Sequence, residues 1–307
     1  NLAIQDAKRT NPDFPVHVSI DNGINLQTNV SNRAIEEVFH PINDVLSKVP
    51  SHLTKYRPGP NENSPTYTII TVTYNAAELL EKTIASIEGQ SCRDFEYIIV
   101  DGASTDATID VIKLHQSSIT HWISERDSGI YHAMNKGIDL ARGKWINFMN
   151  AGDIFSSEDI LEKTLPFCAE PSDVLYGDRY YMKGENKFLQ KAKAIETIFE
   201  RMPFGHQSTF IRTNLLRKVK FNETYRFAAD YNLLINLYKE GRKFRQLDYP
   251  VCCFLAGGQS ESGLRPYLES IKILLDNTSD KNIISQNAYF KAFGSLCTTL
   301  LAQAAGD

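Results

Sequence analysis

The stretch Tyr67-Thr-Ile-Ile-Thr-Val-Thr-Tyr74 decides the fold class of this chain. The stretch is rich in apolar and β-branched residues, and no charged residue interrupts it. This pattern predicts a strand that is buried on both faces of a sheet. Asn75 follows directly, with Glu78 three residues later, a pair that resembles a helix capping box. Apolar residues from Leu80 to Ile87 then recur at helical spacing. The stretch and its surroundings therefore predict a strand followed by a helix.

The same strand-and-helix unit recurs along the next ninety or so residues. Further strands are predicted at Phe95–Val100, Trp122–Ser124 and Lys144–Met149, with Asp106 capping one following helix and Ser157 another. Strand alternating with helix predicts an α/β fold with a doubly wound, mostly parallel sheet and flanking helices. Beyond residue 170 the pattern loosens, and we expect a strand at Val174–Tyr176, a helix at Asp230–Glu240 and helices after about Arg265.

Composition narrows the classes of protein that the chain belongs to. Its 307 residues include 42% apolar and 23% charged residues, with a net charge of −4, as in ordinary globular proteins. No Lys/Arg run suggests nucleic-acid binding, and no apolar run is long enough for a transmembrane helix. The five cysteines show no zinc-type spacing, so we expect free thiols in a reducing compartment, and hence the cytoplasm.

Polar residues follow three of the predicted strands: Asn75, Asp101 and Asp153. An aspartate after a strand is usually a turn residue or a helix cap. Open parallel sheets, however, bind ligands beyond the carboxyl ends of their strands, and three polar residues at one edge favour a site. Asp101 is a candidate acceptor for a base N–H or a ribose hydroxyl. Asp153 is a candidate ligand of a divalent cation that bridges diphosphate oxygens.

Other phosphate-binding and hydrolytic motifs are missing from the sequence. The first predicted strand is followed by neither GxGxxG nor GxxxxGK[ST], and no GxSxG set occurs. These absences argue against dinucleotide-binding, P-loop and serine-hydrolase functions.

The ordered motifs resemble those of family-two glycosyltransferases, in particular the branch found in bacterial exopolysaccharide and colanic-acid-type clusters. The resemblance covers residues 66 to 260 and is carried by TIITVTYN, VDGASTD, ERDSGIYHAMNKG, NAGD, GHQS and ADYNL, which end at Asn75, Asp106, Gly137, Asp153, Ser208 and Leu233. It implies a GT-A-type fold and an inverting hexosyltransferase of bacterial polysaccharide biosynthesis. The donor would be a nucleotide sugar, and the cofactor Mn²⁺ or Mg²⁺.

The resemblance also implies roles for particular residues. Tyr74 and Asp101 would contact the nucleobase, within a nucleotide-binding set that also includes Thr73 and Asn75. Asp153 would be the metal ligand, and Asp230 would deprotonate the acceptor hydroxyl. Donor or acceptor contacts would come from Asn135, Lys136, His206 and Gln207.

Two positions depart from the family pattern, and one catalytic residue has a competing interpretation. Gly152 stands where many relatives carry an aspartate that touches the ribose, and Ala229 stands where a glutamate is common. An inverting transfer needs a base on the acceptor side, opposite an activated leaving group, which Asp230 and Asp153 would supply across a cleft. Asp230 also lies where a helix N-cap is expected, and His206 is equally consistent with packing.

The chain is expected to contain three parts. Residues 1–63 form an appendage with a helix near Arg33–Leu46 and a linker at Arg57–Pro65, residues 64–262 form the transferase domain, and residues 263–307 form a helical extension. Partners would be the donor and a glycan or lipid-linked acceptor, with peripheral contact to the inner membrane or to another synthase domain.

Two alternatives to a glycosyltransferase remain open at the level of sequence. A nucleotidyltransferase uses a similar sheet and metal but wants a Gly-rich, basic loop after the first strand, which Asn75-Ala-Ala-Glu78 does not supply. A non-catalytic glycan-binding module of a larger synthase would explain Gly152.

Overall fold

The computed structural model describes residues 16–20, 24–28, 64–184, 186–257 and 264–294. The chain divides into two units, Asn1–Thr54 and Lys55–Asp307. In the first unit, β1 (Val16–Ile20) and β2 (Ile24–Thr28) pair as an antiparallel hairpin. The helix predicted near Arg33–Leu46 and most of the predicted linker lie outside the described residues. The three-part division predicted from sequence stays a prediction.

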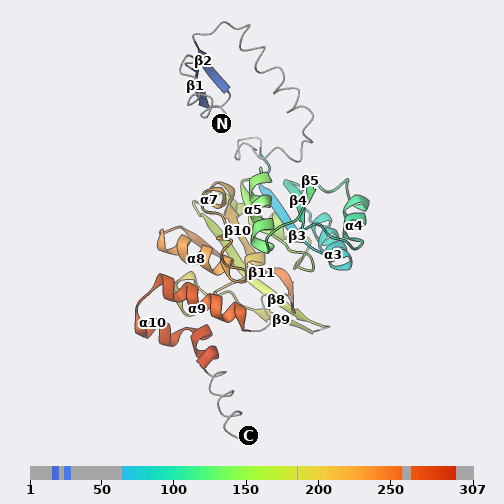
Figure 1. Cartoon of the computed structure of the whole chain (residues 1–307). Coiled ribbons are helices and arrows are strands. Elements are labelled where there is room, and N and C mark those ends of the chain that lie inside the picture. Colours follow the sequence, from blue (N-terminus) through green and yellow to red (C-terminus); the bar gives the residue numbers. More distant parts are fainter. Residues whose placement is uncertain (1–15, 21–23, 29–63, 185, 258–263, 295–307) are drawn as a thin grey trace. The chain divides into compact units, whose positions relative to one another are not determined.

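The second unit is built on one mixed sheet (Figure 1). Among the described residues its strands follow the order β5-β4-β3-β6-β10-β8-β11-β7, and β9 pairs with β8. The β5-β4-β3-β6 part is parallel, as predicted, whereas β10 runs antiparallel to both of its neighbours. The strands are β3 (Tyr67–Thr73), β4 (Phe95–Asp101), β5 (His121–Ser124), β6 (Trp145–Phe148), β7 (Ile154–Phe155), β8 (Val174–Lys183), β9 (Asn186–Gln190), β10 (Thr209–Arg212) and β11 (Phe244–Leu255).

Helices cover both faces of this sheet (Figure 1). They are α3 (Ala77–Glu88), α4 (Thr108–Leu114), α5 (Ile130–Leu140), α6 (Ile160–Cys168), α7 (Thr213–Val219), α8 (Ala229–Lys239), α9 (Arg265–Asn277) and α10 (Lys281–Gln286), with 3-10 turns η2 (Ile195–Phe199) and η3 (His206–Ser208). No helix among the described residues is long and apolar enough to cross a membrane.

Strand β3 is buried along its whole length, as its apolar sequence predicts. Ile70 and Val72 pack into a core with α5, α7 and α8, and Tyr67 and Ile69 pack into a second core with α3 and α6. Because successive side chains of a strand point to opposite faces, this one strand anchors both cores. The sequence between Tyr67 and Thr73 therefore contributes to both cores of the second unit.

Two predicted helix caps are wrong. Asn75 does not cap α3: its backbone is left-handed, with φ 48°, and its side-chain oxygen accepts from Thr105 N–H at 2.8 Å. Ser157 does not cap α6, whose N-cap is Asp159; the serine hydroxyl instead donates to that aspartate at 2.6 Å. In both cases the polar side chain finds a different partner from the helix N–H groups that the sequence pattern suggests.

Candidate active site

The candidate site lies beyond the carboxyl ends of β3, β4 and β6. The strand order reverses between β3 and β6, which is where open α/β sheets form ligand-binding crevices. The chain leaving β6 runs on beside β3, because Met149 N donates to Ile70 O and Ala151 N to Val72 O. The turn at Gly152 and Asp153 therefore lies next to the end of β3.

The turn after β6 is held by Thr83 of α3. Its hydroxyl accepts from Gly152 N–H at 2.9 Å and donates to Asp153 O at 2.8 Å. Gly152 has φ 102°, and a Cβ there would lie 3.2 Å from a Leu255 side-chain carbon. A glycine is favoured here because L-residues rarely adopt that backbone conformation. The departure from the family pattern at this position thus has a local structural reason.

Asp153 is a buried carboxylate with only 5% of its surface exposed. One oxygen accepts from Gln207 Nε2 at 3.1 Å and the other from Leu255 N–H at 3.0 Å. Burial raises its pKa to about 6, although those hydrogen bonds and the charges of His206 and Arg179 oppose the rise.

The residues around Asp153 fit a divalent cation that substrate would help to bind. No group of three or more His, Cys, Asp or Glu side chains in the described ranges is placed to hold a metal by itself. A carboxylate offers about four lone-pair positions, and Asp153 uses two of them for hydrogen bonds. A hard cation completes its coordination with water and phosphate oxygens, and its charge would offset the cost of burying this carboxylate.

Asp230 lies in the first turn of α8, which begins at Ala229 after an Ala228 cap. The interpretation of Asp230 as an N-cap is therefore wrong, and its side chain faces other elements. One oxygen accepts from His206 Nδ1 at 2.9 Å, and the other lies 3.0 Å from the Tyr131 hydroxyl. Burial favours a higher pKa, but the hydrogen bonds and charge of His206 and the bond from Tyr131 outweigh it and lower the pKa.

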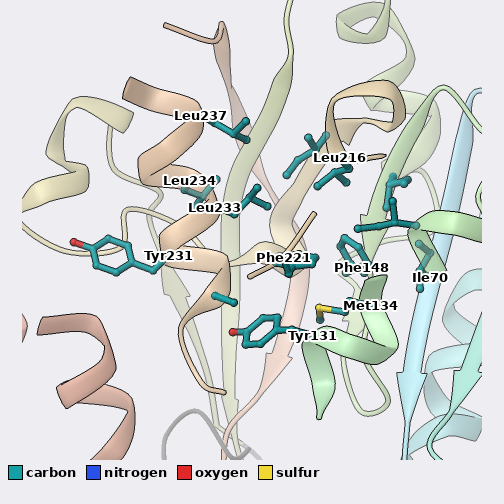
Figure 2. Packing of buried hydrophobic residues seen from close by; sticks show 14 of the residues in the cluster. Ile70, Tyr131, Met134, Phe148, Leu216, Phe221, Tyr231, Leu233, Leu234 and Leu237 are labelled. Carbon is teal, nitrogen blue, oxygen red and sulfur yellow. The ribbon is translucent and has the colours of Figure 1, made fainter. Parts of the chain in front are cut away.

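An apolar cluster backs Asp230. Figure 2 shows Tyr131 of α5 beside Phe221, with Leu233 and Leu234 of α8 in the same cluster. A cavity of about 10 Å³ lies between Phe221, Leu233 and Leu234 and is also lined by Asp230 and His206. Because this is room for about one water molecule, the back of the carboxylate is nearly dry.

His206 and Gln207 join the two carboxylates. They are consecutive residues of η3, between β10 and the loop that precedes it; His206 contacts Asp230 and Gln207 donates to Asp153. His206 Nε2 also lies 3.0 Å from Asn150 Nδ2, on the turn that carries Asp153. The structure thus brings four of the sequence-predicted site residues together in one hydrogen-bonded set.

The predicted nucleotide-binding residues form a second group at the ends of β3 and β4. Tyr74 is 62% exposed, so its ring is free for stacking. A Cβ atom at Gly102 would lie 3.3 Å from that ring and 2.8 Å from Asp127 Oδ2. Gly102, Tyr74 and Asp127 are therefore neighbours. Thr73 Oγ1 is buried with no hydrogen-bond partner among the described residues.

Asp101 is fully buried and serves as an internal acceptor. It accepts from Ser104 N–H at 2.9 Å, from the Ser124 hydroxyl at 2.6 Å and from the Ser104 hydroxyl. The same serine hydroxyl accepts from Asn75 N–H at 2.8 Å, which links the loops after β3 and β4. The nucleotide contacts assigned to these residues stay predictions.

Asn135 and Lys136 of α5 have partners within the protein. Asn135 Nδ2 donates to Phe221 O at 2.9 Å and Glu223 Oε1 at 2.8 Å, and its oxygen accepts from Phe221 N–H at 2.9 Å. Lys136 Nζ lies 2.9 Å from Glu125 Oε1 and donates to Arg126 O at 2.9 Å. Their predicted contacts with donor or acceptor stay predictions. In the structure, Asn135 connects α5 to the segment at Phe221 and Glu223, and Lys136 connects α5 to the segment at Glu125 and Arg126.

Sequence reasoning missed two residues of the site. Tyr131 lies in the motif that ends at Gly137, but the motif implies no role for it. Its role follows from its hydroxyl, which lies 3.0 Å from Asp230 Oδ1. Arg179 of β8 comes so close to Gly205 that a Cβ there would lie 2.5 Å from its guanidinium nitrogen. Arg179 forms no ion pair with a carboxylate of the described residues. Its positive charge partly opposes the rise that burial causes in the pKa of Asp153. Nothing in the local sequence around Arg179 signals this position.

A helix-flanked α/β sheet with such a site defines the GT-A class of glycosyltransferase. Two solved structures support the fold. The mannosyltransferase PcManGT from Pyrobaculum calidifontis, solved with GDP-Man and Mn²⁺, is 18% identical with a TM-score of 0.60 and covers 90% of this chain and 84% of its own. S. aureus TarS 1–349 with UDP-GlcNAc is 19% identical with a TM-score of 0.58 and covers 74% and 71%. The match spans 41% of a longer TarS chain.

The sequence itself shows the family. The family model "Glycosyl transferase family 2" matches residues 68–234, and the chain belongs to that family. A similar curated protein is the PGL/p-HBAD biosynthesis glycosyltransferase of Mycobacterium bovis, 34% identical over 181 residues, which is 57% of this chain and 70% of that protein. The family and the GT-A-type fold inferred from sequence are thereby confirmed.

Proposed function

We propose that this glycosyltransferase moves a hexosyl group from a nucleoside-diphosphate sugar to a hydroxyl group of a glycan or lipid-linked glycan, with inversion. The observation that carries the proposal is the pairing of two carboxylates, one buried and one largely buried, through consecutive residues: Asp153 with Gln207 and Asp230 with His206. Inversion needs a base on the acceptor side and leaving-group activation opposite, and this pairing supplies one group for each task.

Asp230 is the proposed base, and Asp153 is the proposed metal ligand. Asp230 stays ionised at neutral pH because its pKa is lowered, so it is ready to accept the hydroxyl proton. A bound Mn²⁺ or Mg²⁺ would offset the charge that develops on the diphosphate as it leaves. Arg179, whose guanidinium is near Asp153, adds positive charge on the same side.

The nucleotide part of the donor is proposed to bind at the ends of β3 and β4. The exposed ring of Tyr74 offers a stacking surface. The UDP-GlcNAc and GDP-Man complexes of the two similar structures support a donor of this class. The acceptor class follows the resemblance to exopolysaccharide transferases.

We also propose that the enzyme works in the cytoplasm, in peripheral contact with an anionic membrane or with another synthase domain. The β8–β9 hairpin supports such a contact, because Phe188 and Leu189 are 55% and 47% exposed on it. Exposed lysines at 183, 187, 191 and 193 lie near them in the sequence, and Lys191 pairs with Asp178 at 2.7 Å. A basic and apolar edge of this kind favours anionic lipid surfaces. Sedimentation with anionic vesicles tests the contact, and binding that is unchanged by Phe188→Ser would count against it.

The test of the proposed reaction uses a panel of UDP-, GDP- and dTDP-sugars with Mn²⁺ and a set of glycan acceptors. We expect release of nucleoside diphosphate, and NMR of the product should show the anomeric configuration opposite to that of the donor. Retention of configuration, or release of pyrophosphate in place of nucleoside diphosphate, would contradict the proposal.

A further inference from the structure

His206 occupies the side of Asp230 on which a proton can still be accepted. Asp230 Oδ1 already lies 3.0 Å from the Tyr131 hydroxyl and 2.9 Å from Tyr231 N–H. Oδ2 has one hydrogen-bond partner, His206 Nδ1 at 2.9 Å. The Tyr131 hydroxyl also lies 3.0 Å from Phe227 O, so its one proton is shared between two acceptors. Since each carboxylate oxygen has two lone-pair positions, Oδ2 keeps one open beside the imidazole.

The partners of His206 fix which ring nitrogen carries its proton. An ionised Asp230 only accepts hydrogen bonds, so Nδ1 must be the donor in the 2.9 Å contact. On the other side of the ring, Nε2 lies 3.0 Å from the side-chain amide of Asn150. The contact with Asp230 places a proton on Nδ1.

Asn150 adds a second observation to this arrangement. Its Oδ1 is buried and has no hydrogen-bond partner among the described residues. Among the described residues, the side-chain amide of Asn150 has one hydrogen-bond partner, which is His206. Asn150 therefore spends its available side-chain hydrogen bond on orienting that ring.

We propose that His206 is a positioning residue for the base, and that Asn150 in turn orients His206. The inference rests on the proposed role of Asp230 and replaces a direct sugar contact of His206 with an indirect one. In the reaction the acceptor O–H bond breaks and its proton passes to Asp230 Oδ2. The acceptor oxygen forms the bond to the anomeric carbon, and the nucleoside diphosphate leaves with the electron pair. His206 holds Oδ2 in line by donating from Nδ1 throughout.

Three variants test this assignment kinetically. His206→Ala removes the donor, and we expect kcat to fall about 100-fold while the KM for the nucleotide sugar changes by less than about threefold. His206→Asn keeps an N–H near the Nδ1 position and should recover activity to within about tenfold of the unsubstituted enzyme. The matched control is His115→Ala, because His115 Nδ1 pairs with Glu88 at 3.1 Å in another part of the protein; it should leave both constants unchanged.

A double-mutant cycle separates this inference from the base assignment. In an Asp230→Asn background, His206→Ala should cost little more, because two residues that act as a unit are not additive. If Asp230→Asn alone retains full activity, the proposed function fails. If Asp230→Asn keeps only residual activity and His206→Ala lowers that activity by the same factor as in the parent, or if His206→Ala alone raises KM with kcat unchanged, the positioning role is overturned and a direct donor contact is favoured.

A measurement without turnover completes the test. In ¹⁵N-labelled protein, Nδ1 of His206 should carry a proton, and Asp230→Asn or Asn150→Ala should change the chemical shift of that nitrogen. Finding the Nε2–H tautomer in the unsubstituted protein would overturn the proposal whether or not a substrate is known. Variant folding is checked by thermal melting, and His206→Asn serves where His206→Ala fails to fold.

Discussion

The pKa values of two aspartates of the site, Asp153 and Asp230, are shifted in opposite directions by their surroundings. Burial raises the pKa of Asp153 to about 6, whereas hydrogen bonds from His206 and Tyr131 overcome burial and lower the pKa of Asp230. Titratable groups whose pKa values diverge within one site typically divide the chemical roles between them. The opposite pKa shifts agree with the proposed roles of Asp153 as a ligand of a cation and of Asp230 as an ionised base that accepts a proton.

At the residue scale, Asp153→Asn should stabilise the metal-free protein at neutral pH. The folded-state pKa of about 6 lies above the reference value of 3.8, so the buried charge destabilises the fold fully above pH 6 and not at all below pH 3.8. The upper limit of this effect is about 3 kcal/mol. Chemical denaturation from pH 8 to pH 4 should show the variant more stable at pH 8 and the gap closing as pH falls.

The control for this experiment is the same comparison with Asp159→Asn, at an exposed carboxylate that pairs with Ser157 and Lys163 at the start of α6. That variant should show no gain at pH 8. Saturating Mn²⁺ with nucleoside diphosphate should remove the advantage of Asp153→Asn, since only the unsubstituted carboxylate binds the metal. An Asp153→Asn variant less stable than the parent at pH 8 would contradict this account.

At the element scale, the strands of the parallel half were predictable and the helix caps were not. The apolar stretches at Tyr67–Thr73 and Phe95–Asp101 form strands because their whole length is suited to burial. Caps depend on which N–H group a short polar side chain reaches in three dimensions. Asn75 turns to the loop after β4, a partner thirty residues away that local spacing does not reveal.

Antiparallel β10 was the other feature that local sequence could not supply. It lies between β6 and β8, and the turn before it places His206 and Gln207 against the two carboxylates. The motifs predicted that these residues belong to the site, but their partners follow from the sheet order. The site was therefore predictable as a set of residues and not as a set of contacts.

Asn135 provides a prediction about how α5 is joined to the segment after α7. Its buried amide makes three hydrogen bonds to Phe221 and Glu223. Asn135→Ala should lower the free energy of unfolding by about 2–3 kcal/mol, because it leaves buried backbone groups unpaired. Nucleotide binding measured by calorimetry should stay within about threefold of the parent once the protein is folded. A large loss of nucleotide affinity with unchanged stability would instead support the direct donor contact.

At the scale of the whole molecule, the family domain lies inside the larger unit, Lys55–Asp307. Both of its cores are built from residues of that unit alone. We therefore expect a variant lacking residues 1–54 to fold and to bind nucleoside diphosphate with Mn²⁺ as the full chain does. Circular dichroism and calorimetry measure this, and loss of folding on removal would place the domain boundary earlier in the chain.

The central claim is that Asp230 and Asp153 perform different tasks within one site, and comparing their variants tests it most directly. Nucleoside diphosphate release and metal-dependent nucleotide binding are measured on Asp230→Asn and Asp153→Ala. We predict that Asp230→Asn loses at least about 100-fold in kcat while keeping Mn²⁺-dependent binding. Asp153→Ala should lose both properties. Two variants that both retain transfer, or an Asp153→Ala variant whose binding still responds to Mn²⁺, would contradict the account.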